Sequence, residues 1–343
     1  MDRRAFLTGT AAGTIALAAP HIARAQETTV LRVHQMLPAQ ATIPARAIEP
    51  WTQRVADASG GRLSFELYPA MQLGGAPADL YDQARDGVVD LIWTVLGYTP
   101  GRFPRSEVFE LPFMVTTGQA TSVAFHRFVD ANAMDEFAGV KLLCVHAHGP
   151  GLFHTKTPVT KLEDLAGMKI RGGSRIINDM LTRLGAEPVG MPVPQVPEAL
   201  STGVIDGTTI PWEVTPSLRV AELVTNHTGF AGDHGLYTQT FGFTMNLDRY
   251  NALPDDLRAI IDDNAGVETA RAFGRAMDEG DTVGIEIAQA AGNDIVTLDA
   301  AETARWKEAS QPTIDQWYAD SGAAGFDGTA LHEAAQALVE AEM

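Results

Sequence analysis

Two matching junctions, one in each half of the chain, constrain its fold more than any other feature. Each is a helical pattern that ends at a glycine and passes directly into a short apolar run: Asp86-Gly87-Val88-Val89-Asp90 and Thr202-Gly203-Val204-Ile205-Asp206. Glycine ends helices readily because it adopts the left-handed conformation without strain. The repetition therefore predicts two halves of similar plan.

Strand and helix patterns alternate around these junctions. We predict strands at 30–34, 63–68, 88–93 and 168–171, and helices at 43–59, 79–85, 175–184 and 196–202. Ser174 is a favourable N-cap for the third of these helices. Such alternation is typical of an α/β fold with a mainly parallel sheet, and a cleft between two such domains commonly binds a small ligand.

The last third of the chain is predicted to be mostly helical. One long amphipathic helix is expected to start at Pro254 and run into the 280s, with two more at 300–317 and 329–340. These helices should pack against the two domains.

The first 25 residues resemble an export signal. Arg3-Arg4 precede a short apolar run and Ala23-Arg24-Ala25 has the form of a signal-peptidase site, so the mature chain would begin at Gln26. Paired arginines of this kind indicate twin-arginine export to the periplasm. The apolar run is shorter than the ~20 residues that span a bilayer. The mature protein is therefore not expected to be membrane-spanning.

Composition excludes some classes of function. The net charge is −18, and loss of the signal, with three arginines against one aspartate, would make the mature chain still more acidic. Such a chain repels phosphate backbones, which argues against a nucleic-acid partner. Cys144 is the only cysteine, so no disulfide framework or thiolate metal site is expected, and its apolar surroundings predict a buried structural side chain.

Several short motifs, in a specific order and spacing, add to this picture. They are Gly61-Arg62-Leu63, Glu66-Leu67-Tyr68-Pro69, Gln72-Leu73-Gly74, Asp86-Gly87-Val88-Val89-Asp90, Glu110-Leu111-Pro112-Phe113, the run 162–171 (LEDLAGMKIR), the run 199–207 (ALSTGVIDG) and Leu253-Pro254. With them the chain resembles the substrate-binding subunits of tripartite ATP-independent periplasmic (TRAP) transporters along its whole mature length.

The resemblance implies a two-domain periplasmic solute-binding protein with hinge strands and a long domain-spanning helix. We expect domain I at 26–148 with 236–275, domain II at 149–235 with 276–300, and C-terminal helices at 301–343 that pack on both. It also implies that membrane subunits driven by an ion gradient receive the solute. No cofactor is expected.

Arg171 is the principal candidate for ligand binding. It ends the predicted strand 168–171 just before the helix capped by Ser174, and a guanidinium fork binds a carboxylate with two hydrogen bonds. The helix N-terminus adds positive potential. In the family that this chain resembles, the arginine of the Lys-Ile-Arg motif binds the carboxylate of the solute. The alternative is an arginine paired with a local carboxylate at the surface.

The sequence departs from relatives that bind sialic acid or C4-dicarboxylates. The segment 153–157 contains no arginine, and 208–213 reads Thr-Thr-Ile-Pro-Trp-Glu where some relatives have polar residues. Ile210 and Trp212 therefore predict a more apolar pocket, suited first to an aromatic or apolar monocarboxylate and second to a keto or hydroxy acid.

Other candidate wall residues stand near predicted strand ends. Aromatic candidates could sandwich a flat ligand, whereas histidine, glutamine and glutamate could hydrogen-bond to it; each could equally be structural. The set comprises His34, Gln35, Trp93, Tyr98, Phe153, His154, Trp212, Glu213 and Tyr237.

A metal site and an enzyme are the weaker alternatives. His146 and His148 have a spacing that metals use, but no third ligand stands at a persuasive spacing. The Glu-Trp pair of relatives that bind keto acids through a metal would align near 209–210 and is absent. An exported hydrolase or isomerase acting on a small acid is the alternative from another class, although the sequence lacks G-x-S-x-G, H-E-x-x-H and S-x-x-K motifs. A ligand sensor that feeds a receptor would use the same residues, so the sequence does not distinguish it from a transport protein.

Overall fold

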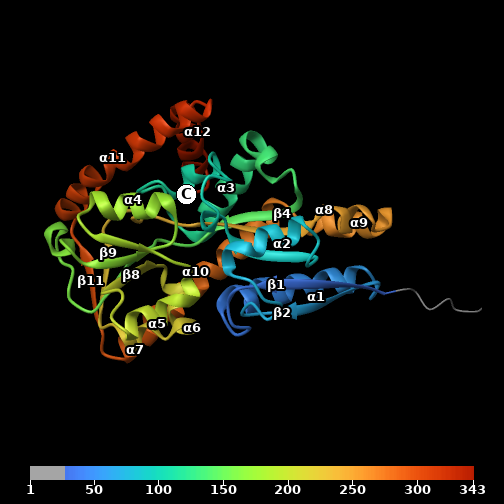
Figure 1. Ribbon diagram of the computed structural model, residues 1–343, viewed down its shortest axis with the longest axis horizontal. Coiled ribbons are helices and arrows are strands. Elements are labelled where there is room, and N and C mark those ends of the chain that lie inside the picture. The colour runs from blue at the N-terminus through green and yellow to red at the C-terminus, as the bar shows by residue number, and fades with distance from the viewer. Residues whose placement is uncertain (1–27) are drawn as a thin grey trace, which may run out of the picture.

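The computed structural model describes residues 28–343, and the expected export signal at 1–25 lies outside the described residues. Two sheets organise this part of the chain into two lobes that lie side by side (Figure 1). The α/β fold expected from the alternating patterns is confirmed. Within residues 28–343, no helix combines the length and apolar character needed to cross a membrane.

The first lobe is built on a five-stranded sheet. The strands, in spatial order, are β2 (Leu63–Tyr68), β1 (Thr29–Gln35), β3 (Leu91–Val95), β10 (Thr240–Asn246) and β4 (Val140–Ala147). Every residue of β3 and β10 is buried. The central position of β3 explains why its sequence is a nearly continuous apolar run.

The second lobe is built on a six-stranded sheet. Its order is β11 (Asp294–Leu298), β9 (Asn226–Phe230), β5 (Leu152–Thr155), β8 (Gly207–Ile210), β6 (Lys169–Gly172) and β7 (Glu187–Gly190).

Both sheets are mixed, each for the same reason. In the first sheet β10 is antiparallel to its neighbours β3 and β4. In the second, β5 is antiparallel to β8 and β9. β5 and β10 are the strands that enter their sheet directly from the other lobe, so each runs against the strands beside it. The expected mainly parallel pairing holds for the other neighbouring pairs.

Helices cover the sheets and link them. Their bounds are α1 (Glu49–Ala58), α2 (Leu80–Arg85), α3 (Gly118–Asn132), α4 (Arg175–Arg183), α5 (Val196–Ser201), α6 (Thr215–Leu218), α7 (Val220–Leu223), α8 (Leu247–Asn251), α9 (Asp255–Asp263), α10 (Val267–Ala290), α11 (Ala300–Ala324) and α12 (Gly328–Glu340). A π-helical turn at Pro44–Ile48 leads into α1.

Three predicted elements differ from the structure by more than two residues. The helix expected at 300–317 continues to Ala324 as α11. The single helix expected from Pro254 into the 280s is wrong: α9 and α10 are separate, because Gly266 adopts a φ of 83° that no helix accommodates. The strand expected at 88–93 begins only at Leu91. Val88 is 54 % exposed, since the preceding residues form the turn that ends α2.

Three segments connect the lobes before the C-terminal helices begin. The chain crosses between β4 and β5, returns between β9 and β10, and crosses again in α10. The two strand crossings touch where Gly151 pairs with Tyr237 in an isolated bridge. A Cβ at Gly151 would lie 2.2 Å from the Tyr237 ring, so only glycine permits this contact.

Helix α10 is fixed to both lobes (Figure 1). Asp278 accepts hydrogen bonds from the N–H groups of Gly118 and Gln119 at the start of α3, at 2.6 and 2.9 Å. One turn along, Asp281 accepts from the N–H of Glu213 in the second lobe, at 2.7 Å. These carboxylates supply the acceptors that free N–H groups at helix and turn starts require.

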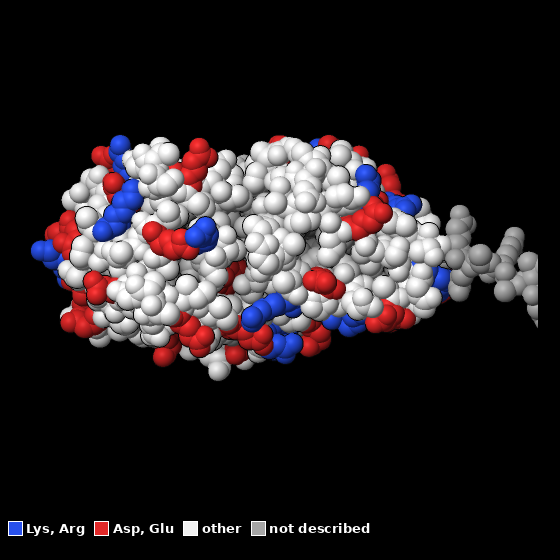
Figure 2. Space-filling model, turned by 90° about the horizontal axis from the view of Figure 1, so that it is seen from below, with Lys and Arg blue, Asp and Glu red and all other residues white. Residues whose placement is uncertain are grey.

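The C-terminal helices also span the molecule. Helix α11 packs on α4 of the second lobe, whereas α12 packs on α3 of the first (Figure 1). Figure 2 shows one face, on which charged side chains are scattered over both lobes and the widest uncharged area lies on the first lobe.

Candidate functional site

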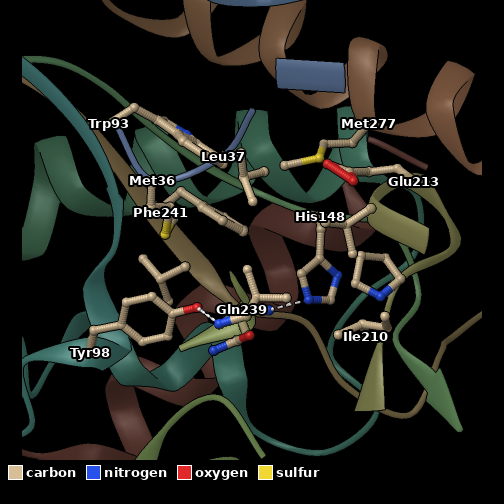
Figure 3. A pocket seen from close by; sticks show the side chains of 14 residues that line it. Met36, Leu37, Trp93, Tyr98, His148, Ile210, Glu213, Gln239, Phe241 and Met277 are labelled. Atoms are coloured by element: carbon tan, nitrogen blue, oxygen red, sulfur yellow. Dashed lines mark hydrogen bonds between the residues drawn. The ribbon is translucent and has the colours of Figure 1, made fainter. Parts of the chain in front are cut away.

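A small cavity lies between the two lobes and is lined by residues of both. Its walls come from both sheets and from α10 (Figure 3). They comprise Met36, Leu37, Trp93, Val95, Tyr98, His148, Val193, Ile210, Pro211, Glu213, Val214, Gln239, Phe241 and Met277.

Arg171 lies behind one end of this cavity and is completely buried. Its Nε–H donates to the carbonyl oxygen of Met191 at 2.9 Å, and its two terminal nitrogens reach the Thr209 carbonyl at 3.3 Å and the Tyr98 hydroxyl at 3.4 Å. A guanidinium has five N–H donors. Within residues 28–343 no aspartate or glutamate forms an ion pair with it, and its hydrogen bonds go to neutral oxygens.

The sequence around Arg171 explains how the guanidinium comes to be there. Strand β6 places Arg171 in the sheet interior and ends at Gly172-Gly173. A Cβ at Gly173 would lie 2.3 Å from the amide of Gln239, so glycine lets the strand end approach that side chain. Ser174 then caps α4, because its hydroxyl accepts a hydrogen bond from the N–H of Ile177, as the sequence predicts.

Tyr98 joins the lobes at the Arg171 end of the cavity. It belongs to the first lobe, yet its hydroxyl accepts hydrogen bonds from Val193 N–H at 2.8 Å and from Arg171, both in the second lobe. Burial raises the pKa of Tyr98, while the nearby Arg171 charge opposes that shift. The phenol is therefore neutral, and in the described part of the chain it donates its own hydrogen to no partner.

Two further polar groups lie at the same end. Gln239 Nε2 and the Tyr237 hydroxyl are buried and have no hydrogen-bond partner among residues 28–343. Burial raises the pKa of Tyr237. Together with Tyr98 and Arg171, these side chains bring several unused N–H and O–H donors to one end of the cavity.

His148 is a neutral imidazole that holds this end in place. Its Nε2 lies 3.0 Å from the backbone N–H of Gln239, which can only donate, so Nε2 accepts and the proton resides on Nδ1 (Figure 3). Nδ1–H donates to the carbonyl of Gly149. Burial lowers the pKa of His148 to about 3, consistent with the neutral form.

An aromatic stack forms part of the cavity wall. Phe241 stacks against both Trp93 and His146, which lie side by side, with ring centroids 5.2 and 4.8 Å away and planes within 11° of parallel. The Trp93 indole N–H donates to His146 Nε2 at 2.8 Å. Because this bond satisfies the indole, the wall presents apolar surface, which suits a flat or aliphatic ligand.

The sequence-predicted residues divide into two groups. Trp93, Tyr98, Ile210 and Glu213 line the cavity, while Arg171 and Tyr237 adjoin its polar end. The other five are buried elsewhere.

His34 and Gln35 support the chain that follows β1. His34 Nδ1 lies 2.7 Å from the Gln83 side chain, and its Nε2 accepts from Leu73 N–H at 3.3 Å. Gln35 bonds through its side chain to both backbone groups of Leu37. Neither faces the cavity, although Leu37, which Gln35 positions, does.

Phe153, His154 and Trp212 pack inside the second lobe. Phe153 lies against Trp306, with ring centroids 5.4 Å apart. His154 bonds to His227 at 2.7 Å and to the Ile210 carbonyl at 3.2 Å. Trp212 packs edge-on against His154. The expectation that Trp212 covers the ligand is not supported by this placement.

Sequence reasoning missed most of the apolar wall. Met36, Leu37, Val193, Val214, Phe241 and Met277 line the cavity without belonging to any motif. Gln239 and His148 were missed as well, because they meet only through the chain crossings. The described residues contain no group of three or more His, Cys, Asp or Glu suited to a metal ion.

Two lobes, the segments that connect them and a small cavity between them define a two-domain solute-binding protein. Comparison with protein families agrees: residues 34–321 match the family of bacterial extracellular solute-binding proteins, family 7 (DctP). The chain belongs to this family, which confirms the resemblance to TRAP transporter subunits and makes it an extracytoplasmic, periplasmic protein.

Solved structures of TRAP solute-binding proteins are similar over nearly the whole chain. One from Rhodoferax ferrireducens T118, with copurified benzoate, is 47% identical, covers 92% of this chain and 98% of its own, and has a TM-score of 0.90. One from a marine metagenome, specific for aromatic acids and holding 3-hydroxybenzoate, is 44% identical, with coverage of 92% and 99% and a TM-score of 0.91. One from Bordetella bronchiseptica, with bound mandelate, is 30% identical, with coverage of 91% and 99% and a TM-score of 0.85.

Proposed function

We propose that this protein captures an aromatic monocarboxylate in the cavity between its lobes and delivers it to the membrane subunits of a TRAP transporter. The observation that carries the proposal is Arg171: a fully buried guanidinium that has no carboxylate partner in the described chain. A buried unpaired charge costs several kcal/mol, and an incoming carboxylate would supply the missing partner.

The remaining cavity favours an aromatic acid over a dicarboxylate or sugar acid. Most free donors gather at the Arg171 end, and apart from Glu213 the wall beyond is built from Trp93, Phe241 and aliphatic side chains. A second carboxylate or several hydroxyls would lose water there without gaining partners, at a cost of about 1–3 kcal/mol for each polar group. The bound acids of the three similar structures fit this expectation.

We propose in addition that the two lobes act as domains that close over the ligand, with the boundaries expected from sequence. Tyr98 supports closure, because its hydroxyl bonds Val193 and Arg171 across the cavity. The protein would not transform its ligand. The charged groups near the cavity hold backbone or lie unpaired, and none forms a nucleophile–base pair.

The test is a binding panel on the mature chain from Gln26 onward. Benzoate, 3-hydroxybenzoate, mandelate, succinate and galactonate would each be tested by thermal shift and calorimetry. A ligand at 100 times its Kd adds about 2.7 kcal/mol of stability, which raises the melting temperature measurably. We expect the aromatic monocarboxylates to bind and to be recovered unchanged. Binding of succinate or galactonate alone would refute the aromatic assignment.

A further inference from the structure

Glu213 is a buried carboxyl group that has no part in binding the carboxylate of the ligand. It follows β8 in a 3₁₀ turn at Trp212–Val214, is 3 % exposed, and lines the cavity. Its Oε2 has no hydrogen-bond partner among residues 28–343. A buried polar atom without a partner costs about 1–3 kcal/mol, so this group is costly unless a ligand satisfies it.

The main chain of Glu213 is held from both sides. Its N–H donates to Asp281 Oδ1 at 2.7 Å, and its carbonyl accepts from the Thr42 hydroxyl at 3.2 Å. Helix α10 presses on it closely, since a Cβ at Gly280 would lie 2.8 Å from the Glu213 Cβ. The position from which the carboxyl group enters the cavity is therefore fixed by packing.

Glu213 lies away from the Arg171 end. Figure 3 shows its carboxyl group beside Met277, across the cavity from the Tyr98 hydroxyl that Arg171 contacts. The side chains drawn between them, Leu37 and Phe241, are apolar. A ligand whose carboxylate meets Arg171 would thus direct its far end towards Glu213.

The protonation state of Glu213 sets what it can recognise. Burial raises its pKa to about 8, and the nearby Asp281 charge adds to the shift. At neutral pH the group mostly keeps its proton, so it offers one O–H donor and one carbonyl acceptor. A hydroxyl group matches this pair, because it too donates and accepts.

We propose that Glu213 recognises a hydroxyl group at the end of the ligand remote from its carboxylate, which makes the preferred ligand a hydroxy-substituted aromatic acid. This inference rests on the proposed function and assigns it a specificity-determining residue. A second carboxylate would be repelled by Asp281 and would lack a cation. An ammonium group would require Glu213 to ionise, whereas the ligand carboxylate and Arg171 already balance each other.

The experiment compares affinity ratios within each variant. Calorimetry on the mature protein would give Kd for benzoate, 3-hydroxybenzoate, 4-hydroxybenzoate and 4-(aminomethyl)benzoate. Glu213→Met removes both hydrogen-bonding atoms at similar length, and Glu213→Gln retains a neutral donor and acceptor. Glu286→Met, an exposed carboxylate on α10, is the matched control. Thermal unfolding would establish that each variant is folded.

We expect one hydroxybenzoate to bind at least tenfold more tightly than benzoate in the wild type, the control and Glu213→Gln. In Glu213→Met that ratio should fall to about one. Benzoate binding without any hydroxyl preference would overturn the inference while leaving the proposed function intact. An unchanged ratio in Glu213→Met, or tightest binding of the ammonium compound, would also overturn it. Failure of every aromatic acid to bind would instead refute the proposed function.

Discussion

Replacing Arg171 by methionine should abolish most of the ligand affinity without unfolding the protein. The guanidinium uses three of its five N–H donors on Met191, Thr209 and Tyr98, which leaves two donors for a carboxylate. Removing one partner of a buried hydrogen-bonded charge pair costs about 2–5 kcal/mol. At about 1.4 kcal/mol per tenfold, this corresponds to a roughly 30- to 4,000-fold weaker Kd.

The stability of the unliganded variant should change little. Arg171→Met leaves two buried carbonyl oxygens without donors, but it also removes a buried charge that has no counter-ion in the described chain, and the two effects oppose each other. Calorimetry with benzoate would give the affinity, and thermal unfolding would give the stability.

The matched control is Arg175→Met, four positions along the same segment. Arg175 is exposed and pairs with Glu107 and Asp320, so its loss removes the same charge without touching the cavity. We expect its affinity to stay within a few-fold of wild type. A loss smaller than fivefold in Arg171→Met, or an equal loss in both variants, would refute the carboxylate clamp.

Three further perturbations test the site and its scaffold. Glu213→Gln should reduce the pH dependence of stability. The folded-state pKa of Glu213, about 8, lies above the ordinary value of 4.5, so between these pH values the folded protein retains a proton that the unfolded chain loses. The free energy of unfolding therefore falls as pH rises through this range. Burial also raises the pKa values of Glu110 and Asp281 to about 7, so both proteins should lose stability between pH 6.5 and 8. Urea unfolding should show a steeper fall in wild type than in Glu213→Gln, by up to ~1.4 kcal/mol per pH unit, and equal slopes would contradict the buried acid. Gly274→Ala should lower stability by ~1–3 kcal/mol, because its Cβ would lie 2.4 Å from a backbone carbonyl oxygen of α3. Gly229→Ala is the control and should not lower stability, because there is open space around Gly229. Equal melting temperatures of the two variants would show that α10 and α3 can separate freely. Tyr98→Phe removes the acceptor of a buried Val193 N–H and should weaken ligand binding about tenfold by calorimetry; unchanged affinity would mean that this bond does not stabilise closure.

The fold could be predicted from sequence because local signals and their repetition agreed. Ser174 caps α4 through its hydroxyl, as its position before an apolar helical face predicts. The break between α9 and α10 escaped notice because both helices present apolar faces, and a single Gly266 with positive φ carries no periodic signal. The mixed pairing of the sheets depends on which lobe a strand comes from, which local patterns do not encode.

The cavity could be predicted only where a motif marked it. Arg171 belongs to a motif, and Tyr98 follows a strand end. Met277 and Phe241 reach the cavity from a helix and a strand that are distant in sequence, and their residue types are those of ordinary core. His154 shows the opposite error, since a polar side chain near a crossing found its partners, His227 and a backbone carbonyl, inside its own lobe.

Because the Arg171 guanidinium has no carboxylate partner in the described chain, the closed conformation can indicate that a ligand is bound. Closing the lobes removes the Arg171 guanidinium from water, which costs hydration free energy. In the ligand-free protein no carboxylate of the described chain pairs with it to offset that cost. A bound acid offsets this cost through its own negative charge, so ligand binding favours the closed conformation. A transporter that binds only the closed conformation would then not bind the ligand-free protein. Arg171 would thereby limit docking to the ligand-bound form.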